Sequence, residues 1–399
     1  MRIAGIIAEY DPFHNGHATH IANTRAENGG KATHVVTVIS GSFTQRGEPA
    51  LLSKYQRAEM ALNCGADLVL ELPLPWAMAP AENFASGGVA VLNALGCIDL
   101  LSFGSECGDT ATLKKLADLS TDPLYQSALK SELDNGIPYA AAGQKAAAQI
   151  LGAEIAEHLA SPNNTLGIEY LRAIAAQGID WDVFTLQRQG ALHGDMVAKD
   201  TFASASMLRE MVRKDNMSLL SAYMPQSTVS ILQAAHQRGE TTTHSSRLEH
   251  ALMAHLRRLS VEEYSHLPWL SEGLENRLYR ESRTAVDYTA LLDAVKTRRY
   301  PMARLRRVLW ASLIGLTATD TVGLPPYIRV LGMNERGREI LAAASPTLPI
   351  LSRTAQISEL NVRAKHIFEL ECTATDLHAL AMANPLPCGT DHTTKLIVK

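Results

Sequence analysis

The chain has 399 residues and a formal net charge of −4 at pH 7. This length exceeds what one hydrophobic core usually holds, so we expect at least two domains. The weak negative charge excludes a globally basic nucleic-acid coat but allows a local basic face. The five cysteines have neither Cys-x-x-Cys spacing nor nearby histidines, which argues against a metal site of that type and against a disulfide framework.

The amino-terminal stretch MRIAGIIAEYDPF carries one basic residue and an apolar run too short for a secretion signal or a membrane span. Later segments also fall short of the roughly 18 uninterrupted apolar residues that a transmembrane helix needs. We therefore expect a cytoplasmic protein with no membrane partner.

Strand and helix patterns alternate through the first hundred residues. Short apolar, β-branched runs predict strands at 2–10, 33–43, 66–76 and 97–106. Helical patterns lie between them, at 17–28, 53–65 and 81–96. This alternation is typical of an α/β fold with a parallel sheet and helices on both of its faces.

The remaining sequence is mostly helical in pattern. An Ala-rich stretch at 140–160 and the segments 161–174 and 201–212 predict helices, and 180–190 predicts a late strand. Few strand signals follow residue 227. We therefore predict a Rossmann-like parallel-sheet domain over residues 1–226 and a mainly α-helical domain over residues 227–399, which ends in a short strand-like tail.

Two histidines follow the first predicted strand in the stretch FHNGH, where His14 and His17 flank Asn15 and Gly16. Ligands of open α/β sheets bind at the carboxyl ends of strands, and a helix N-terminus offers free N–H groups to an anion. Two imidazoles there can donate hydrogen bonds to phosphate oxygens. The alternative interpretation is a capped turn with exposed histidines.

This stretch resembles the His-x-Gly-His signature of the nucleotidyltransferase superfamily that includes class I aminoacyl-tRNA synthetases. The resemblance implies ATP with its phosphates on the histidines, and a second phosphate loop at a later helix. FASASMLRE fits that loop with Ser204, Ser206 and Arg209. Hydroxyls, helix N-terminal amides and arginine can all hold phosphate oxygens. The alternative is an ordinary serine helix cap.

Several segments together narrow the resemblance to one family. EYDPFHNGH, SGSFTQRGEPALLSKYQRAEMAL, DLVLELP, FGSE, SPNNTLGIEY, FASASMLR and YIRVLGMNERG are similar to the bacterial tRNA(Met) cytidine acetate ligase family, from residue 1 to about residue 340. The resemblance implies a nucleotidyltransferase fold and an enzyme that uses acetate and ATP to make N4-acetylcytidine at the wobble position (position 34) of elongator tRNA(Met). We expect AMP and diphosphate as products. Mg²⁺ is expected with ATP, although no carboxylate cage for it is evident.

The family resemblance implies the following site. The catalytic residues are His14, His17, Ser206 and Arg209. The nucleotide-binding residues are Ile7, Ala8, Glu9, Tyr10, Asp11, Pro12, Phe13, His14, Asn15, Gly16, His17, Ala18, Thr19, His20, Gly104, Asn163 and Arg188. Asn164 is the alternative to Asn163. Gly104 also fits a strand-end turn, Asn163 a helix cap and Arg188 a surface charge.

Other charged positions are open. Gln45, Arg46 and Lys54 follow the second strand and can bind acetate, pyrophosphate or RNA, or belong to a solvated loop, and His193 is a further candidate. Residues 296–313 hold six Lys or Arg side chains and no acid, which favours a track for tRNA phosphates over a solvated basic face. The predicted tRNA contacts are Arg298, Arg299, Arg304, Arg307, Arg329 and Arg336.

Two other functions compete with this prediction. One is a small-molecule adenylyltransferase, against which the long helical region and its arginines argue. The other is a non-catalytic tRNA- or ribosome-binding protein, against which intact His14, His17, Ser206 and Arg209 argue. A homo-oligomer is compatible with the sequence.

Overall fold

The computed structural model describes residues 1–188, 201–271, 273–297 and 300–399. In these residues eight strands form one sheet in the order β5-β4-β1-β2-β3-β6-β7, and β8 pairs with β6. The strands are β1 (Ile3–Ala8), β2 (His34–Ser40), β3 (Leu68–Leu72), β4 (Leu100–Ser105), β5 (Asp182–Gln187), β6 (Ile328–Met333), β7 (Ile350–Leu351) and β8 (Ile397–Val398). The predicted α/β fold with a parallel sheet is confirmed.

The first five strands are parallel to one another. β1 lies between β2 and β4, β5 continues beyond β4, and β3 continues beyond β2. The carboxyl ends of these strands therefore meet at one edge of the sheet, which we call the carboxyl edge. Loops that follow any of these strands can contribute side chains to a single site there.

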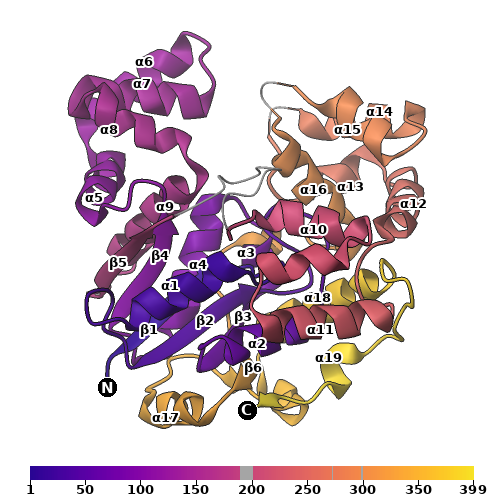
Figure 1. Ribbon diagram of the computed structural model, residues 1–399. Coiled ribbons are helices and arrows are strands. Elements are labelled where there is room, and N and C mark those ends of the chain that lie inside the picture. The colour runs from indigo at the N-terminus through magenta and orange to yellow at the C-terminus, as the bar shows by residue number, and fades with distance from the viewer. Residues whose placement is uncertain (189–200, 272, 298–299) are drawn as a thin grey trace.

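Both faces of the sheet are covered by helices (Figure 1). Alternate residues of β2 enter different hydrophobic clusters, with Val36 and Val38 in one and Val35 and Ile39 in the other. The helices of residues 1–213 are α1 (Asn15–Arg25), α2 (Lys54–Asn63), α3 (Leu74–Ala77), α4 (Ala81–Asn93), α5 (Thr110–Asp118), α6 (Pro123–Asp134), α7 (Tyr139–Leu151), α8 (Ala153–Glu157), α9 (Pro162–Ala176) and α10 (Ala205–Arg213).

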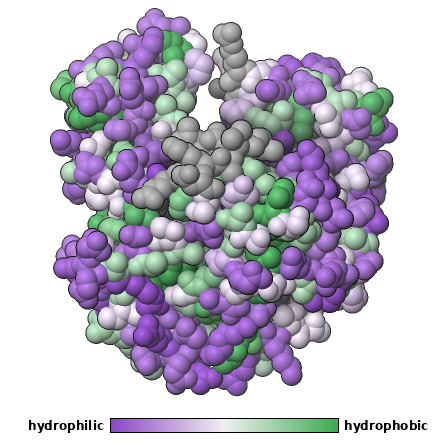
Figure 2. Space-filling model, viewed as in Figure 1, coloured by the Kyte–Doolittle hydropathy of each residue, from purple (hydrophilic) through white to green (hydrophobic). Residues whose placement is uncertain are grey.

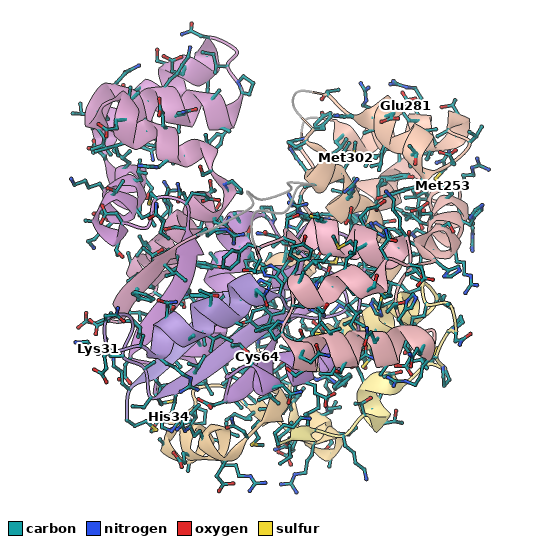
Figure 3. The ribbon with its side chains drawn as sticks, in the orientation of Figure 1. Lys31, His34, Cys64, Met253, Glu281 and Met302 are labelled. Atoms are coloured by element: carbon teal, nitrogen blue, oxygen red, sulfur yellow. The ribbon has the colours of Figure 1, made fainter. Side chains whose placement is uncertain are left out.

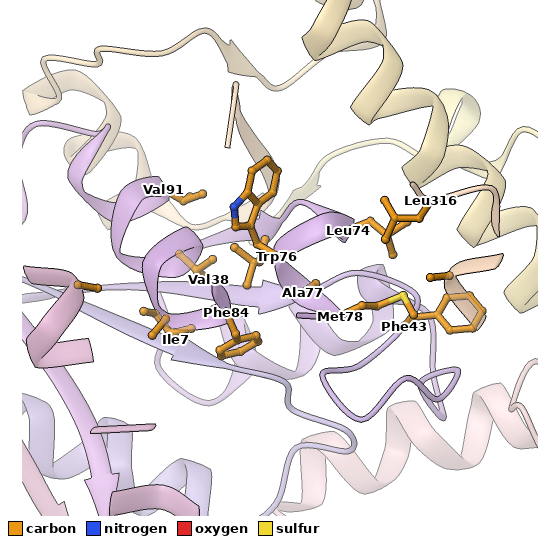
Figure 4. Packing of buried hydrophobic residues seen from close by; sticks show 14 of the residues in the cluster. Ile7, Val38, Phe43, Leu74, Trp76, Ala77, Met78, Phe84, Val91 and Leu316 are labelled. Atoms are coloured by element: carbon orange, nitrogen blue, oxygen red, sulfur yellow. The ribbon is translucent and has the colours of Figure 1, made fainter. Parts of the chain in front are cut away.

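The larger cluster includes Trp76, which is 1% exposed (Figure 4). Phe84 and Ile7 belong to the same cluster. Gly87 of α4 lies directly against this ring, since an added Cβ would be 2.5 Å from the Cβ and Cγ atoms of Trp76. A glycine is thus required where α4 approaches the short helix α3. This contact fixes the helices beneath the carboxyl edge.

The C-terminal part is mainly helical. Its helices are α11 (Gln226–Gln237), α12 (Ser245–Leu256), α13 (Val261–Ser265), α14 (Leu274–Thr284), α15 (Tyr288–Val295), α16 (Met302–Ile314), α17 (Glu335–Ala343), α18 (Val362–Ala379) and α19 (Thr390–Thr393). Short 3-10 helices occur in both parts of the chain, at η1 (Leu119–Thr121), η2 (His158–Ala160), η3 (Met217–Ala222), η4 (Ala318–Thr321) and η5 (Thr354–Glu359). No helix among the described residues is long and apolar enough to cross a membrane.

The C-terminal part also completes the sheet, and of its strands the sequence indicated only the tail that contains β8. β6 pairs antiparallel with β3, and β7 and β8 both pair with β6. The two parts of the chain therefore share one sheet. The domain boundary predicted at residue 226 stays a prediction. Since β6 runs opposite to β3, the helix α17 that follows β6 lies at the amino edge. There Glu339 contacts His34, the first residue of β2, which Figure 3 labels.

A buried group of charged side chains joins the two parts at the end of β3. Lys54 Nζ lies 2.7 Å from Glu71 Oε1 and 2.9 Å from Asp391 Oδ1. Arg329 reaches the same two carboxylates, at 3.0 Å and 3.1 Å. Burial, followed by the neighbouring Glu71 carboxylate, raises the pKa of Glu371 well above its ordinary value. With Glu371 protonated, two cations face two carboxylates and the group is neutral.

Candidate active site

A cavity of about 530 Å³ opens at the carboxyl edge. Its walls come from the ends of β1, β4 and β5, from the loops after β1, β2 and β5, and from the first turns of α1, α4, α9 and α10, with one residue of α16. This volume lies in the range of cavities that hold nucleotide-sized ligands. Segments far apart in the sequence thus share one site.

The two histidines of the first loop cap α1 by a reciprocal pair of hydrogen bonds. His14 Nδ1 accepts the backbone N–H of Gly16 at 3.1 Å, and His17 Nδ1 accepts the backbone N–H of His14 at 3.2 Å. The two rings are stacked, with centroids 3.7 Å apart. Because each Nδ1 is an acceptor, the proton of each neutral imidazole resides on Nε2. Both side chains line the cavity.

Burial keeps these imidazoles neutral. It lowers the pKa of His14 to about 3, with a smaller contribution from Arg188. The pKa of His17 is also well below its ordinary value, first through burial and then through His14. His20 forms a hydrogen bond with Ser102 Oγ at 2.9 Å, and burial lowers its pKa to about 4. At neutral pH the cavity therefore presents neutral imidazole rings as N–H donors. A bound polyanion would favour protonation of these rings.

The second predicted phosphate loop lies directly against the first. Arg209 Nη1 donates to the backbone oxygen of Asp11 at 2.7 Å and lies 3.4 Å from the Asp11 carboxylate. Its Nη2 donates to Ser206 Oγ at 3.2 Å. Ser204 caps α10, because its Oγ accepts the N–H of Met207 at 3.1 Å. The structure thus brings His14, His17, Ser206 and Arg209 to one cavity wall.

Other residues of the first loop divide into two groups. Those that line the cavity are Ile7, Ala8, Glu9, Tyr10, Asp11, Gly16, Thr19 and His20. Pro12, Phe13, Asn15 and Ala18 are absent from its walls. Asn15 instead donates to the backbone oxygens of Thr201 and Ala222, at 3.1 Å and 3.2 Å. These bonds hold the start of α1 to the segment that surrounds α10.

The predicted nucleotide contacts at the ends of β4 and β5 and at the start of α9 form the neighbouring part of the wall. Gly104 and Arg188 line the cavity, and an added Cβ on Gly104 would meet Arg188 Cγ at 3.5 Å. Asn163 also lines it, with Nδ2 donating to Glu106 Oε1 at 2.6 Å. Asn164 is fully buried, and its Oδ1 accepts the N–H of Glu106 at 2.9 Å. The geometry favours Asn163 over Asn164 as the exposed contact.

Sequence reasoning missed the apolar part of the cavity. Phe84, Phe103, Leu166, Tyr170 and Phe202 contribute to its walls. Phe84 and Tyr170 are only 2% and 4% exposed. Because they are buried like ordinary core residues, their helical spacing in the sequence does not distinguish them from the core. A hydrophobic period marks the face that a helix buries but not whether a ligand shares that face.

The residues predicted to contact tRNA do not form one surface. Arg298, Arg299 and the candidate His193 lie outside the described residues. Arg329 is 6% exposed and paired with carboxylates, as is Lys54 at 0%, so neither offers an open cation. Arg336 lies on α17 at the amino edge, since β6 is antiparallel, and does not extend the α16 surface as expected. Arg304 and Arg307 remain on α16.

No group of three or more His, Cys, Asp or Glu side chains is positioned for a metal ion within the described part of the chain. Mg²⁺ remains an expectation that accompanies the nucleotide. Positive charge in the cavity comes from Arg46, Arg188, Arg209 and Arg307. These arginines can bind phosphate oxygens without a metal cage.

Comparison with known proteins identifies the family. The model of the HIGH nucleotidyl transferase family matches residues 1–391. A tRNA(Met) cytidine acetate ligase of Thermoanaerobacter sp. (strain X514) is 38% identical, and one of Acetivibrio thermocellus is 36% identical, each over 100% of both chains. The chain belongs to the tRNA(Met) cytidine acetate ligase family. The resemblance inferred from the sequence is confirmed.

Solved structures from this ligase family have the same fold. Thermotoga maritima TmcAL without ligand matches with a TM-score of 0.94 and 30% identity, over 100% of this chain and 99% of that one. The same protein bound with α-thio ATP matches with a TM-score of 0.91 and 29% identity, at equal coverage. The Rossmann-like nucleotidyltransferase architecture predicted for the ligase family is thereby confirmed.

Proposed function

We propose that this chain is an ATP-dependent ligase that activates acetate as acetyl-AMP and transfers the acetyl group to N4 of the wobble cytidine of elongator tRNA(Met). Its relatives are tRNA(Met) cytidine acetate ligases along their full length, and the related TmcAL binds α-thio ATP. The observation that carries the proposal is the hydrogen bond of 2.7 Å between Arg209 and the Asp11 carbonyl. It joins both phosphate loops of an adenylating enzyme in one cavity.

In the first step, a carboxylate oxygen of acetate attacks the α-phosphorus of ATP and the bond to the β-phosphate breaks. Negative charge grows on the departing diphosphate. The Nε2–H groups of His14 and His17, the Ser206 hydroxyl and the Arg209 guanidinium are the donors we assign to that charge. Donors already held in place need no reorganisation during the reaction, so they stabilise the transition state more than the ground state.

In the second step, N4 of the cytidine attacks the acetyl carbon, the amine loses a proton and AMP leaves. The cytosine of an anticodon loop is single-stranded and can be turned into a cavity. Gly104, Asn163 and Arg188 are assigned to the adenosine end, because they line the cavity at the ends of β4 and β5 and at the start of α9. The apolar side chains of Phe103 and Tyr170 favour exclusion of water, which would otherwise hydrolyse acetyl-AMP.

We assign the tRNA-facing surface to the lobe of α12 to α16. In Figure 2 the outline of the molecule is notched between this lobe and the lobe of α5 to α8. Arg304 of α16 is held by the Trp269 carbonyl at 2.9 Å and by Ser271 Oγ at 2.5 Å. Its guanidinium lies 5.7 Å from the ring centre of Tyr300. A fixed cation at this place suits contact with a tRNA phosphate, whereas the Tyr300 ring is buried and serves to hold the guanidinium.

One assay tests the proposal against its rivals. The protein is incubated with radiolabelled acetate, ATP and total tRNA. Label in N4-acetylcytidine, together with AMP and diphosphate, supports the ligase. Nucleotide transfer to a small molecule without labelled tRNA would support an adenylyltransferase instead. Tight tRNA binding without ATP turnover would indicate a non-catalytic binding protein.

A further inference from the structure

Arg307 differs from the other arginines of the C-terminal helices because it reaches the reaction cavity. It is the residue of α16 that lines the same walls as His14 and Arg209. Sequence reasoning placed it on a tRNA surface beside Arg304. Its position inside the cavity requires another role.

Within the described part of the chain, the guanidinium of Arg307 has no counter-charge. Its Nη1 donates to the backbone oxygen of Gln45 at 3.2 Å, and its Nε is buried without a hydrogen-bond partner. No carboxylate of the described residues lies within ion-pair distance of it. Burial, followed by the nearby Arg304, lowers its pKa to about 10. A partly buried cation in this state favours an anionic ligand.

The location of Arg307 indicates which anion. The predicted adenosine contacts lie at the ends of β4 and β5, and the histidine loop follows β1. β2 is the neighbour of β1 on the other side, and the loop after β2 holds Gln45 against Arg307. Gln45 also donates its N–H to Glu9 Oε1 at 2.6 Å, which ties this loop to the end of β1. Arg307 therefore lies on the side of the histidine loop away from the predicted adenosine contacts.

We infer that Arg307 binds the carboxylate of acetate in the adenylation step, a role that rests on the proposed function. One carboxylate oxygen attacks the α-phosphorus while the guanidinium holds the other. The held oxygen then becomes the carbonyl oxygen of acetyl-AMP. When the cytidine amine attacks, negative charge develops on that same oxygen and Arg307 stabilises it. Arg307 therefore contacts the acyl group in both steps.

Acetate-dependent exchange of labelled diphosphate into ATP, measured without tRNA, tests this role. Arg307→Ala should raise the KM for acetate about 10- to 100-fold, because a charge-assisted pair of hydrogen bonds is lost. The Kd for ATP should change by less than about threefold if Arg307 does not contact the nucleotide. Arg307→Lys, which retains a charge without the planar fork, should give an intermediate KM. Added guanidinium ion should partly restore the alanine variant.

The matched control is Arg306→Ala. Arg306 is the adjacent residue of α16 and pairs with Glu48 in the same loop, but it does not line the cavity. Its loss tests whether weakened docking of the loop alone raises the KM for acetate. Equal KM values in both alanine variants would overturn the inference and leave Arg307 a loop anchor. Weaker tRNA binding with an unchanged KM for acetate would overturn it in favour of an RNA phosphate contact.

The melting temperature of each variant is measured first. If Arg307→Ala does not fold, the lysine variant and its KM for acetate decide the question. Failure of the proposed function gives a different result. A wild-type protein that shows no acetate-dependent exchange and no acetylated tRNA would overturn both proposals. An active wild type with unaffected Arg307 variants would overturn only this inference.

Discussion

The two nitrogens of His17 have separable roles, and a pair of substitutions can divide them. Nδ1 accepts the backbone N–H of His14 and so caps α1, whereas Nε2 is the donor assigned to the phosphates. Asparagine places its amide oxygen near the position of Nδ1 but does not reach Nε2. Glutamine reaches both positions, because its amide oxygen can accept at the helix end, as that of Gln56 does for the Ser53 N–H at the start of α2, and its amide nitrogen can donate. His17→Asn therefore keeps the cap and loses the donor, whereas His17→Gln keeps both.

The expected magnitudes follow from these contacts. Loss of a helix-cap acceptor costs about 1 kcal/mol, and since both variants retain an acceptor, each should lower the free energy of unfolding by less than that amount. Loss of one donor to developing charge costs about 100- to 1000-fold in rate, so His17→Asn should lose that much diphosphate exchange at nearly wild-type stability. Urea unfolding and acetate-dependent exchange measure the two effects. Greater loss of exchange in His17→Gln than in His17→Asn would refute the assignment.

Three further predictions concern charge. Arg304→Glu should weaken tRNA binding about tenfold in a filter-binding assay at low salt and leave tRNA-independent diphosphate exchange unchanged; unaltered binding would exclude Arg304 from the RNA surface. Lys54→Met should lower the free energy of unfolding by about 3–5 kcal/mol in urea, since it leaves buried carboxylates unpaired, without a matching change in ATP affinity. For His14, with a pKa near 3 when folded and about 6.5 when unfolded, the unfolded state binds more protons below pH 6.5. Stability should thus fall by about 2 kcal/mol for this residue between pH 7 and pH 5, and His14→Gln should reduce that slope.

The fold was largely predictable because its local signals agree. The strand at 2–10 and the helix at 17–28 were predicted by an apolar run, a turn and a helical pattern, and they became β1 and α1. The cap of α1 was not predictable. Histidine is not among the residues preferred at an N-cap, and the reciprocal contact depends on how both rings are held. The alternative interpretation of His14 as a capping residue and the functional one are both compatible with this geometry.

Two strands of the C-terminal part, β6 and β7, were missed for a different reason, whereas β8 lies in the predicted strand-like tail. β7 contains two residues, too few for a period to be visible. β6 lies between helical segments, and its pairing with β3 spans more than 250 residues of sequence, from Leu68 to Met333. Its direction determined where Arg329 and Arg336 lie. The direction of β6 is not visible in the sequence. The closeness of these arginines to the basic stretch of α16 along the chain therefore suggested one tRNA-binding surface, but the fold places them apart.

Arginines of the C-terminal part show why charge in a sequence does not by itself define a binding surface. Arg329 was predicted from the sequence to contact tRNA. In the folded protein it is buried, and two carboxylates distant in sequence, Glu71 and Asp391, neutralise its charge. Arg307 was predicted to contact tRNA as well. It has no such carboxylate partner among the described residues, and its side chain lines the cavity. Burial of a paired cation stabilises a junction, whereas burial of an unpaired one is unfavourable until an anion binds. The counter-charge, which only the folded chain supplies, therefore separates a structural arginine from one that recognises a substrate.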